Sequence, residues 1–366
     1  MGIDRRARRF SRAGSGAIRR KVAFIEMTNS PVRRPDFANL AAVLERKTPA
    51  RATLFEYFLN DRLYTRLSGL PASADLSDER AAARLIKAFE AAGYDYATLS
   101  CPWIFPMSDA GAQLKSRSLN HPSLIADRAA FERYPWPDAK AYDYGYLDRL
   151  TGVLPEGMGI IMASADGILE TTVALVGYEN LCMMLYDDEE LLSDIFARVG
   201  QIILDFYRQI VGYPAVRAIL CNDDWGFNTQ TLLAPDALRK YVFPWYAQCC
   251  RLAHAQGKYA ILHSCGVFRP ILDDIVQMGF DARHSYEDNI VPVEQAYAEL
   301  HDKIAVLGGI DVDFLCRSTP EAIEQRARAL LSLTGSRGYA LGSGNSIPDY
   351  VPDESYFALT RAALTP

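Results

Sequence analysis

The sequence predicts an α/β fold in which parallel strands and helices alternate and close into a (β/α)8 TIM barrel, with an insertion after strand 2. From about residue 50 onward, short β-rich runs alternate with long stretches of helical periodicity, a pattern typical of parallel strands joined by crossover helices. Eight such units fit a barrel, which typically needs about 250 residues plus insertions. An open doubly wound sheet is the structural alternative, because periodicity does not fix the number of strands.

The expected strands are short, and most end in polar residues. In chain order they lie at 52–58, 94–99, 159–163, 218–222, 259–263, 280–284, 304–308 and 339–341. The clearest expected helices lie between them, at 77–92, 189–211, 234–256, 319–333 and 352–363. Two of these helices have proline directly after Thr319 or Ala234, which suits the first position of a helix.

Composition and charge predict one large globular domain behind a short basic arm. The chain has 366 residues, of which 49% are hydrophobic and 23% charged, enough to build a core. Residues 1–21 contain eight basic side chains and only Asp4 as an acid, so we expect a flexible arm over 1–35 and a single domain over 36–366. The remainder is acidic, which argues against nucleic acid as a partner. The segment 101–158 is long enough to form a lid or wall over one barrel mouth.

Cysteine usage and hydropathy suggest a location inside the cell. Seven cysteines are spread over the chain, too few for a disulfide framework, and indicate a reducing compartment. No apolar run reaches the roughly 18 to 20 residues of a membrane span, and the first twenty residues lack a secretory apolar stretch. We therefore expect a cytoplasmic protein without a membrane partner.

Polar residues that suit catalysis gather where the expected strands end. In a barrel, these carboxyl ends meet at one mouth, where the chemistry takes place. The candidates for catalysis are Asp224, His284 and Asp311. The candidates for substrate binding are Trp225, Tyr286, Ser343 and Asn345.

The sharpest local motif is His263-Ser264-Cys265-Gly266, at the end of an apolar strand. Residues two apart on an extended chain point to the same side, so the imidazole and the thiol are expected to converge. Both are good zinc ligands. The structural alternative is a buried histidine bonded to backbone beside an inert core thiol.

From about Phe37 to the C-terminus, the chain resembles the uroporphyrinogen decarboxylase superfamily, which includes cobalamin-dependent methyltransferases. The motifs that carry the resemblance are Arg46 to Glu56, Trp136-Pro137-Asp138, Gly177-Tyr178-Glu179-Asn180, Asn222-Asp223-Asp224-Trp225-Gly226, His263-Ser264-Cys265-Gly266, Gly308-Gly309-Ile310-Asp311 and Gly342-Ser343-Gly344. The superfamily fold is a (β/α)8 barrel, in agreement with the strand count.

The resemblance favours the methyltransferase branch over true uroporphyrinogen decarboxylases. A porphyrinogen carries about eight carboxylates and needs several inward-facing cations, but only Arg62 follows the first strand. The methyltransferase branch holds zinc with His-x-Cys-Gly and a later cysteine, and these positions correspond to His263, Cys265 and Ser343. Because serine is a poor zinc ligand, we expect Glu56 to complete the site.

Other completions of the metal site stay open at this point. Asp224 could replace Glu56, Cys221 or Cys316 could supply a second thiolate, or the metal could be absent.

The implied reaction is zinc-assisted methyl transfer to or from a corrinoid, which a separate carrier protein would bring. A methoxylated aromatic is the favoured methyl donor, as in an O-demethylase, and a thiol is the other candidate substrate. The alternatives are a metal-free decarboxylase or lyase of the same superfamily and a non-catalytic barrel. A homodimer is also left open.

Overall fold

The computed structural model describes residues 33–72, 79–103, 105–107, 123–164 and 166–365. Residues Arg34–Pro366 form one compact unit. The basic arm expected over 1–35 lies almost entirely outside the described residues, as do residues 104 and 108–122 of the segment that we expected to form a lid.

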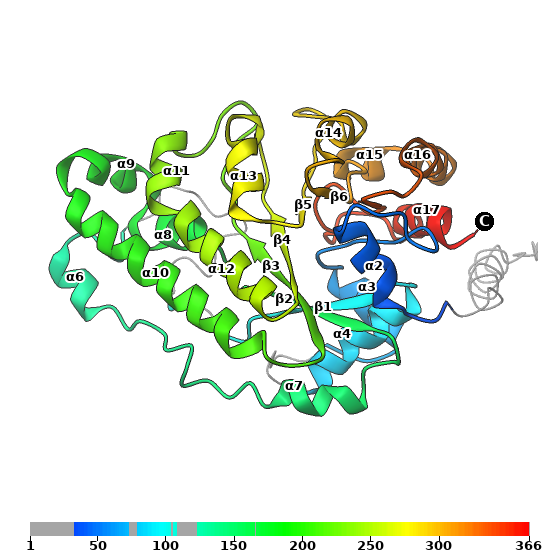
Figure 1. Ribbon diagram of the computed structural model, residues 1–366, viewed down its shortest axis with the longest axis horizontal. Coiled ribbons are helices and arrows are strands. Elements are labelled where there is room, and N and C mark those ends of the chain that lie inside the picture. Colours follow the sequence, from blue (N-terminus) through cyan, green and yellow to red (C-terminus); the bar gives the residue numbers. More distant parts are fainter. Residues whose placement is uncertain (1–32, 73–78, 104, 108–122, 165, 366) are drawn as a thin grey trace, which may run out of the picture. The chain divides into compact units, whose positions relative to one another are not determined.

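Seven parallel strands form one sheet, and their order in the sheet follows their order in the chain (Figure 1). The strands are β1 (Tyr96–Ser100), β2 (Gly159–Ala163), β3 (Val216–Asn222), β4 (Tyr259–His263), β5 (Ala282–His284), β6 (Ala305–Leu307) and β7 (Tyr339–Ala340). Each coincides with one of the expected strands to within two residues at either end. The predicted α/β class and the parallel sheet are therefore confirmed.

The first expected strand, 52–58, does not form a regular strand. Leu54 makes an isolated parallel bridge with Leu341, just after β7. Two backbone hydrogen bonds of 2.8 Å support the bridge, from Phe55 N–H to Leu341 and from Leu341 N–H to Thr53. On its other side, the segment contacts β1 through the Tyr96 hydroxyl, which accepts from the N–H of Glu56 at 2.7 Å and donates to its carbonyl at 2.8 Å. A side chain thus makes the contact that a backbone ladder would make between two strands.

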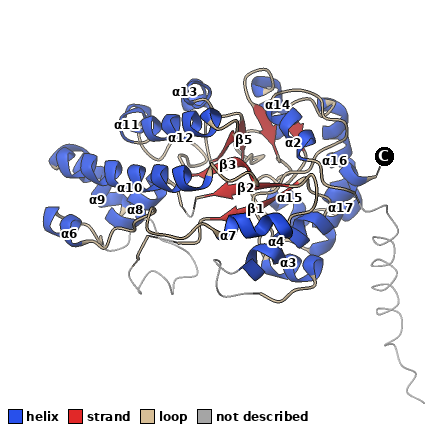
Figure 2. Cartoon of the chain, turned by 60° about the horizontal axis from the view of Figure 1, so that its bottom comes forward, coloured by secondary structure: helices blue, strands red, loops and turns tan. Residues whose placement is uncertain are grey.

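Helices surround the sheet (Figure 2). Those before β2 are α2 (Phe37–Leu44), α3 (Asp61–Ser68), α4 (Glu79–Ala91), α6 (Arg128–Arg133) and α7 (Tyr146–Arg149), with the 3-10 turn η1 (Leu150–Gly152). Those between β2 and β5 are α8 (Ile168–Val176), α9 (Tyr178–Asp187), α10 (Glu189–Ile210), α11 (Pro235–Tyr241), α12 (Phe243–Ala255) and α13 (Leu272–Met278), with η2 (Arg269–Ile271). Those after β5 are α14 (Val293–Leu300), α15 (Val312–Arg317), α16 (Pro320–Thr334) and α17 (Asp353–Leu364).

Local sequence explains where several helices begin. Pro320 is the first residue of α16, and the Thr319 side chain accepts from the Ala322 N–H, which satisfies one of the free donors of the first turn. Asp188 caps α10 in the same way, through the Leu191 N–H. Proline also opens α11, as the sequence predicted.

The core lies between the sheet and its helices. All five residues of β2 are buried, as expected for parallel strands that are covered on both faces. Within the described residues, no single helix is both long and apolar enough to cross a membrane; α8 and α9 meet that criterion only as a joined pair, bent by 92°.

Candidate functional site

The strands β3, β4 and β5 bring two histidines side by side at their carboxyl ends. Asn222 pairs with His263 across β3 and β4, and His263 pairs with His284 across β4 and β5. Residues in register on neighbouring strands share a face of the sheet, so the two imidazoles meet. Their Nδ1 atoms are 2.8 Å apart, and both side chains are buried.

A third and a fourth side chain join this pair from the loops after β3 and β4. The Cys265 sulfur lies 3.9 Å from Nε2 of His263. Asp224 accepts a hydrogen bond of 2.7 Å from the Cys265 N–H through Oδ1. One ligand atom from each of Asp224, His263 and Cys265 lies within 4.8 Å of the others. The structure therefore collects a carboxylate, an imidazole and a thiol in one place.

Two glycines let the loops after β3 and β4 approach this closely. Gly266 has a φ of +81°, and a Cβ added there would lie 2.3 Å from backbone atoms of Gly226. A larger residue at position 266 would push the loops apart and move Cys265 away from Asp224.

The Cys265 sulfur receives two hydrogen bonds. Nδ2 of Asn345 donates to it at 3.2 Å, and the Ser285 hydroxyl donates at 3.5 Å. Burial raises the pKa of this thiol, and the negative charge of Asp224 raises it further. Donors aimed at a sulfur stabilise its thiolate form, and a bound cation would reverse the effect of burial.

Glu56 and Ser343 form a separate buried pair beside the histidines. The Ser343 N–H donates to Oε1 of Glu56 at 2.6 Å, and the Ser343 hydroxyl bonds to Oε2 at 2.7 Å. Burial raises the pKa of the Glu56 carboxyl to about 8, against the lowering effect of these hydrogen bonds. Both carboxylate oxygens are used by Ser343, and among the described residues Glu56 does not belong to the cluster of candidate metal ligands.

The Ser343 backbone continues the contact to the second histidine. Nε2 of His284 lies 3.3 Å from the Ser343 carbonyl oxygen. Burial lowers the pKa of His284 to about 3, although the bond to Ser343 opposes the change. Burial also lowers the pKa of His263, and the nearby His284 and Arg283 lower it further. Both rings are therefore neutral near pH 7.

The neighbours Asp223 and Asp224 have different tasks. Asp223 is fully buried and accepts four hydrogen bonds, from the N–H groups of Leu169 and Glu170, from the Trp225 indole and from the Tyr246 hydroxyl. The first two donors belong to the first turn of α8, so Asp223 fixes that helix to the end of β3. Asp224 is the member of the pair that faces Cys265.

Arg283 is a buried residue of the site that sequence reasoning missed. It is 1% exposed, and its guanidinium donates to the carbonyls of Ser264 at 2.8 Å and Ser285 at 2.5 Å. The guanidinium also lies over the rings of Phe268 and Tyr286, with 4.0 and 4.9 Å to the ring centroids. Arg283 thus braces the residue before Cys265 against the residue that follows β5. Its only sign in the sequence is an arginine within a short expected strand.

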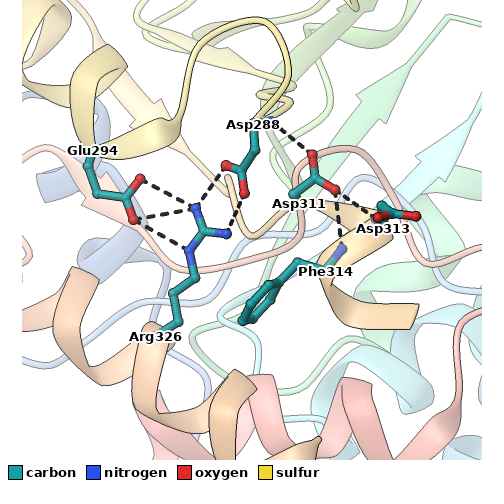
Figure 3. Close-up of polar contacts among 6 residues, drawn as sticks. All are labelled: Asp288, Glu294, Asp311, Asp313, Phe314 and Arg326. Atoms are coloured by element: carbon teal, nitrogen blue, oxygen red, sulfur yellow. Dashed lines mark hydrogen bonds and ion pairs between the residues drawn. The ribbon is translucent and has the colours of Figure 1, made fainter. Parts of the chain in front are cut away.

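Asp311 lies at the start of α15 and takes part in loop structure (Figure 3). Its Oδ1 accepts from the N–H groups of Asp313 and Phe314, and its Oδ2 accepts from the Asp288 N–H at 2.8 Å. Asp288 in turn forms two hydrogen bonds of 2.5 and 2.8 Å with Arg326. The structure gives Asp311 the role of a helix cap that holds a neighbouring loop, and does not bring it to the cluster at Cys265.

Of the four expected substrate-binding residues, three are buried and one is half-buried. Trp225 is 1% exposed and packs against Phe243 and Tyr246, and Tyr286 is 2% exposed beneath Arg283. These two are core residues in this structure. Ser343 is also buried, whereas Asn345 is half-buried against the Cys265 sulfur.

One aromatic ring that we did not single out does contact the histidines. Tyr57 packs on His263, with 4.9 Å between ring centroids. Burial raises the pKa of its hydroxyl, as do the charges of Glu170, Asp166 and Asp224.

The surroundings of Asp224 are strongly acidic. Burial raises the pKa of Glu170 well above its ordinary value, and the charges of Asp224, Asp223 and Asp166 raise it further. Burial also raises the pKa of Glu287, with contributions from Asp311 and Asp224. A cation bound beside these carboxyls would oppose the shifts and favour their ionised forms.

Comparison with known proteins gives the following matches. Among solved structures, a methyltransferase from Methanosarcina mazei superimposes with a TM-score of 0.65 at 15% identity, covering 89% of this chain and 97% of that protein. A B12-independent methionine synthase from Shewanella sp. W3-18-1 gives 0.40 at 14% identity, covering 57% of this chain and 60% of that one. No curated protein matches. The family model described as uroporphyrinogen decarboxylase (URO-D) covers residues 68–365, and the chain therefore belongs to the uroporphyrinogen decarboxylase family.

Proposed function

We propose that the protein is a zinc-dependent methyltransferase, with Asp224, His263 and Cys265 as the metal ligands. The observation that carries the proposal is the convergence of their three ligand atoms within 4.8 Å of one another. Zinc in catalytic sites takes three protein ligands of these types and leaves a fourth position for substrate. Asp224 replaces Glu56 as the third ligand in this proposal, because both oxygens of Glu56 are bonded to Ser343.

The residues around the three ligands suit a bound cation. Asn345 and Ser285 donate to the Cys265 sulfur and so favour a thiolate. Asp224 stays fixed on the Cys265 N–H, which holds the carboxylate beside the sulfur. Burial and neighbouring carboxylates raise the pKa of Glu170 and of Glu287, and a cation bound nearby would favour the ionised forms of both.

We propose methyl transfer as the reaction, between a small donor or acceptor and a corrinoid brought by a carrier protein. Zinc bound at this site would supply a Lewis acid that activates an ether oxygen or lowers the pKa of a thiol. Tyr57, packed on His263, would offer an aromatic surface to an apolar donor such as a methoxylated aromatic. The fold shared with the methyltransferase from Methanosarcina mazei supports this proposal.

Uroporphyrinogen decarboxylation receives less support, despite the family name. Arg62, the one cation that the sequence offered to a porphyrinogen carboxylate, pairs with Asp353 at 2.8 Å and donates to two backbone carbonyls. Arg283 is also bonded to backbone carbonyls. Among the described residues, the neighbourhood of Asp224 is acidic, and a substrate with many carboxylates would be repelled there.

The test of the proposal is zinc binding by the full-length protein and its variants. Metal-free protein is titrated with zinc against a chromophoric chelator, which gives stoichiometry and affinity. We expect one zinc per chain, lost in Cys265→Ala and strongly weakened in Asp224→Asn. Asn can still accept from the Cys265 N–H, so the second variant removes the charge and keeps the loop. Cys316→Ser, at a thiol outside the cluster, serves as the control.

An activity measurement completes the test. Methylcobalamin and a small thiol are mixed with the zinc-loaded protein, and methyl transfer is followed by the change in corrinoid absorbance. We expect zinc-dependent transfer that is absent in Cys265→Ala. Less than stoichiometric zinc in the unaltered protein, or equal zinc affinity in Cys265→Ala and Cys316→Ser, would refute the proposed metal site.

A further inference from the structure

The two buried histidines share a hydrogen bond that constrains where their protons lie. Nδ1 of His263 and Nδ1 of His284 are 2.8 Å apart, which is hydrogen-bonding distance. Such a bond needs a proton on one nitrogen and a lone pair on the other. One of the two rings therefore donates at Nδ1 and the other accepts.

The other nitrogen of His284 must carry a proton. Its Nε2 lies 3.3 Å from the Ser343 carbonyl oxygen, and a carbonyl oxygen only accepts. The carbonyl is held in place, because the Ser343 N–H and hydroxyl are bonded to Glu56 and the Gly309 N–H donates to the same oxygen at 2.8 Å. The His284 ring is confined as well, since a Cβ on Gly308 would lie 2.9 Å from its Nε2.

The shared proton then belongs to His263. If His284 also carried it, that ring would be a fully buried cation, disfavoured further by the charge of the buried Arg283 guanidinium. A second buried positive charge near the first would raise the free energy of the folded protein. A neutral His284 with its proton on Nε2 must accept at Nδ1, so His263 donates from its Nδ1 and keeps an unprotonated Nε2.

We propose that His284 is a positioning residue that holds His263 in the tautomer protonated at Nδ1, with the Nε2 lone pair directed toward Cys265. This inference rests on the proposed metal site and deepens it. An imidazole binds a metal through an unprotonated nitrogen, and a partner on the other nitrogen usually fixes its tautomer and orientation. Here that partner is a second imidazole, and the series runs from Glu56 through Ser343 and His284 to His263.

The tautomer can be measured without any metal. Full-length, metal-free protein labelled with 15N-histidine gives long-range proton–nitrogen spectra in which protonated and bare ring nitrogens differ clearly. The chain has five histidines, few enough to assign by single substitutions. We expect a bare Nε2 and a protonated Nδ1 on His263, and the reverse arrangement on His284. A proton on Nε2 of His263 would overturn the proposal.

Two substitutions at the same position separate positioning from packing. Asn places its Oδ1 near the position of the histidine Nδ1, so His284→Asn keeps an acceptor for His263, whereas His284→Phe removes it. We expect His284→Phe to mix the His263 tautomers and to lower zinc affinity 10 to 100-fold, the usual cost of losing such a partner. His284→Asn should restore the single tautomer and most of the affinity. His254→Asn, at a histidine paired with Asp281 on the surface, is the control.

The outcomes distinguish this inference from the proposed function. The expected tautomers in a protein that binds no zinc would support the histidine arrangement and remove the metal function. Stoichiometric zinc together with a proton on Nε2 of His263 in the metal-free protein would support the metal function and refute the histidine arrangement. Equal tautomer populations in His284→Phe and the unaltered protein would refute the role of His284 directly.

Discussion

The buried carboxyl of Glu56 makes the stability of this protein depend on pH in a defined direction. The perturbation is Glu56→Gln, which keeps the shape of the side chain. Its amide oxygen can accept from the Ser343 N–H, and its NH2 can donate to the Ser343 hydroxyl, so both hydrogen bonds at 2.6 and 2.7 Å have replacements. The variant therefore removes the ionisation and leaves the packing in place.

The magnitude follows from the pKa of this group. Burial raises it from an ordinary 4.5 to about 8 in the folded protein. Below pH 4.5 the carboxyl is protonated in both the folded and the unfolded state. Between 4.5 and 8 the unfolded chain loses the proton while the folded chain keeps it, so the free energy of unfolding falls as pH rises through this window. At about 1.4 kcal/mol per tenfold change in acid dissociation, the full loss is roughly 5 kcal/mol.

The assay is urea unfolding of the unaltered protein and of Glu56→Gln at pH values from 4.5 to 8.5. As pH rises, we expect the variant to gain stability relative to the unaltered protein by most of the roughly 5 kcal/mol. Glu132→Gln, at an exposed position on α6, should show no such gain. A difference between Glu56→Gln and the unaltered protein that stays constant with pH would refute the reasoning. Zinc affinity of Glu56→Gln should also be nearly unchanged, since Glu56 is not a ligand in our proposal.

Two further substitutions test the framework that holds the site. Asp223→Ala leaves four donors without their acceptor. At about 1.5 to 3 kcal/mol for each hydrogen bond to a charged group, we expect the free energy of unfolding in urea to fall by more than roughly 4 kcal/mol. A loss under about 1 kcal/mol would contradict this role. Arg283→Met keeps an apolar stem against Phe268 and leaves the carbonyls of Ser264 and Ser285 without a donor. We expect it to destabilise the protein by about 2 to 4 kcal/mol, and unfolding curves that superimpose on those of the unaltered protein would show that the brace is unimportant.

Most of the strands were predictable because they leave a strong local pattern. An apolar run of four to six residues that ends in a polar residue is visible without any knowledge of its neighbours, as in Tyr259 to His263. The segment 52–58 has the same pattern but makes only one bridge, and on its other side it meets β1 through the Tyr96 hydroxyl. A contact of that kind has no trace in the local sequence.

The site was predictable in part for similar reasons. His263 and Cys265 are two residues apart at a strand end, so their proximity follows from the geometry of extended chain. The nearness of Glu56 and Ser343 follows from the order of the first and last segments around the sheet. The choice of Asp224 as a metal ligand depends on Asp223 being occupied by four donors. The importance of Arg283 depends on which carbonyls its guanidinium contacts. Both are properties of the folded chain alone.

The contact between Tyr96 and Glu56 also has a consequence for how the molecule can be altered. Between residues 53–56 and β1, the described structure has a phenol hydroxyl where two strands would share several amide hydrogen bonds. This junction rests on one side chain that is fully buried and packed against Phe55, Phe89 and Tyr94. Removing its hydroxyl, as in Tyr96→Phe, would therefore leave the Glu56 N–H and carbonyl without their partner while the backbone pairing from β1 to β7 stays unaltered. For a designer who wishes to reshape the region beside Ser343, this hydroxyl is the contact to preserve.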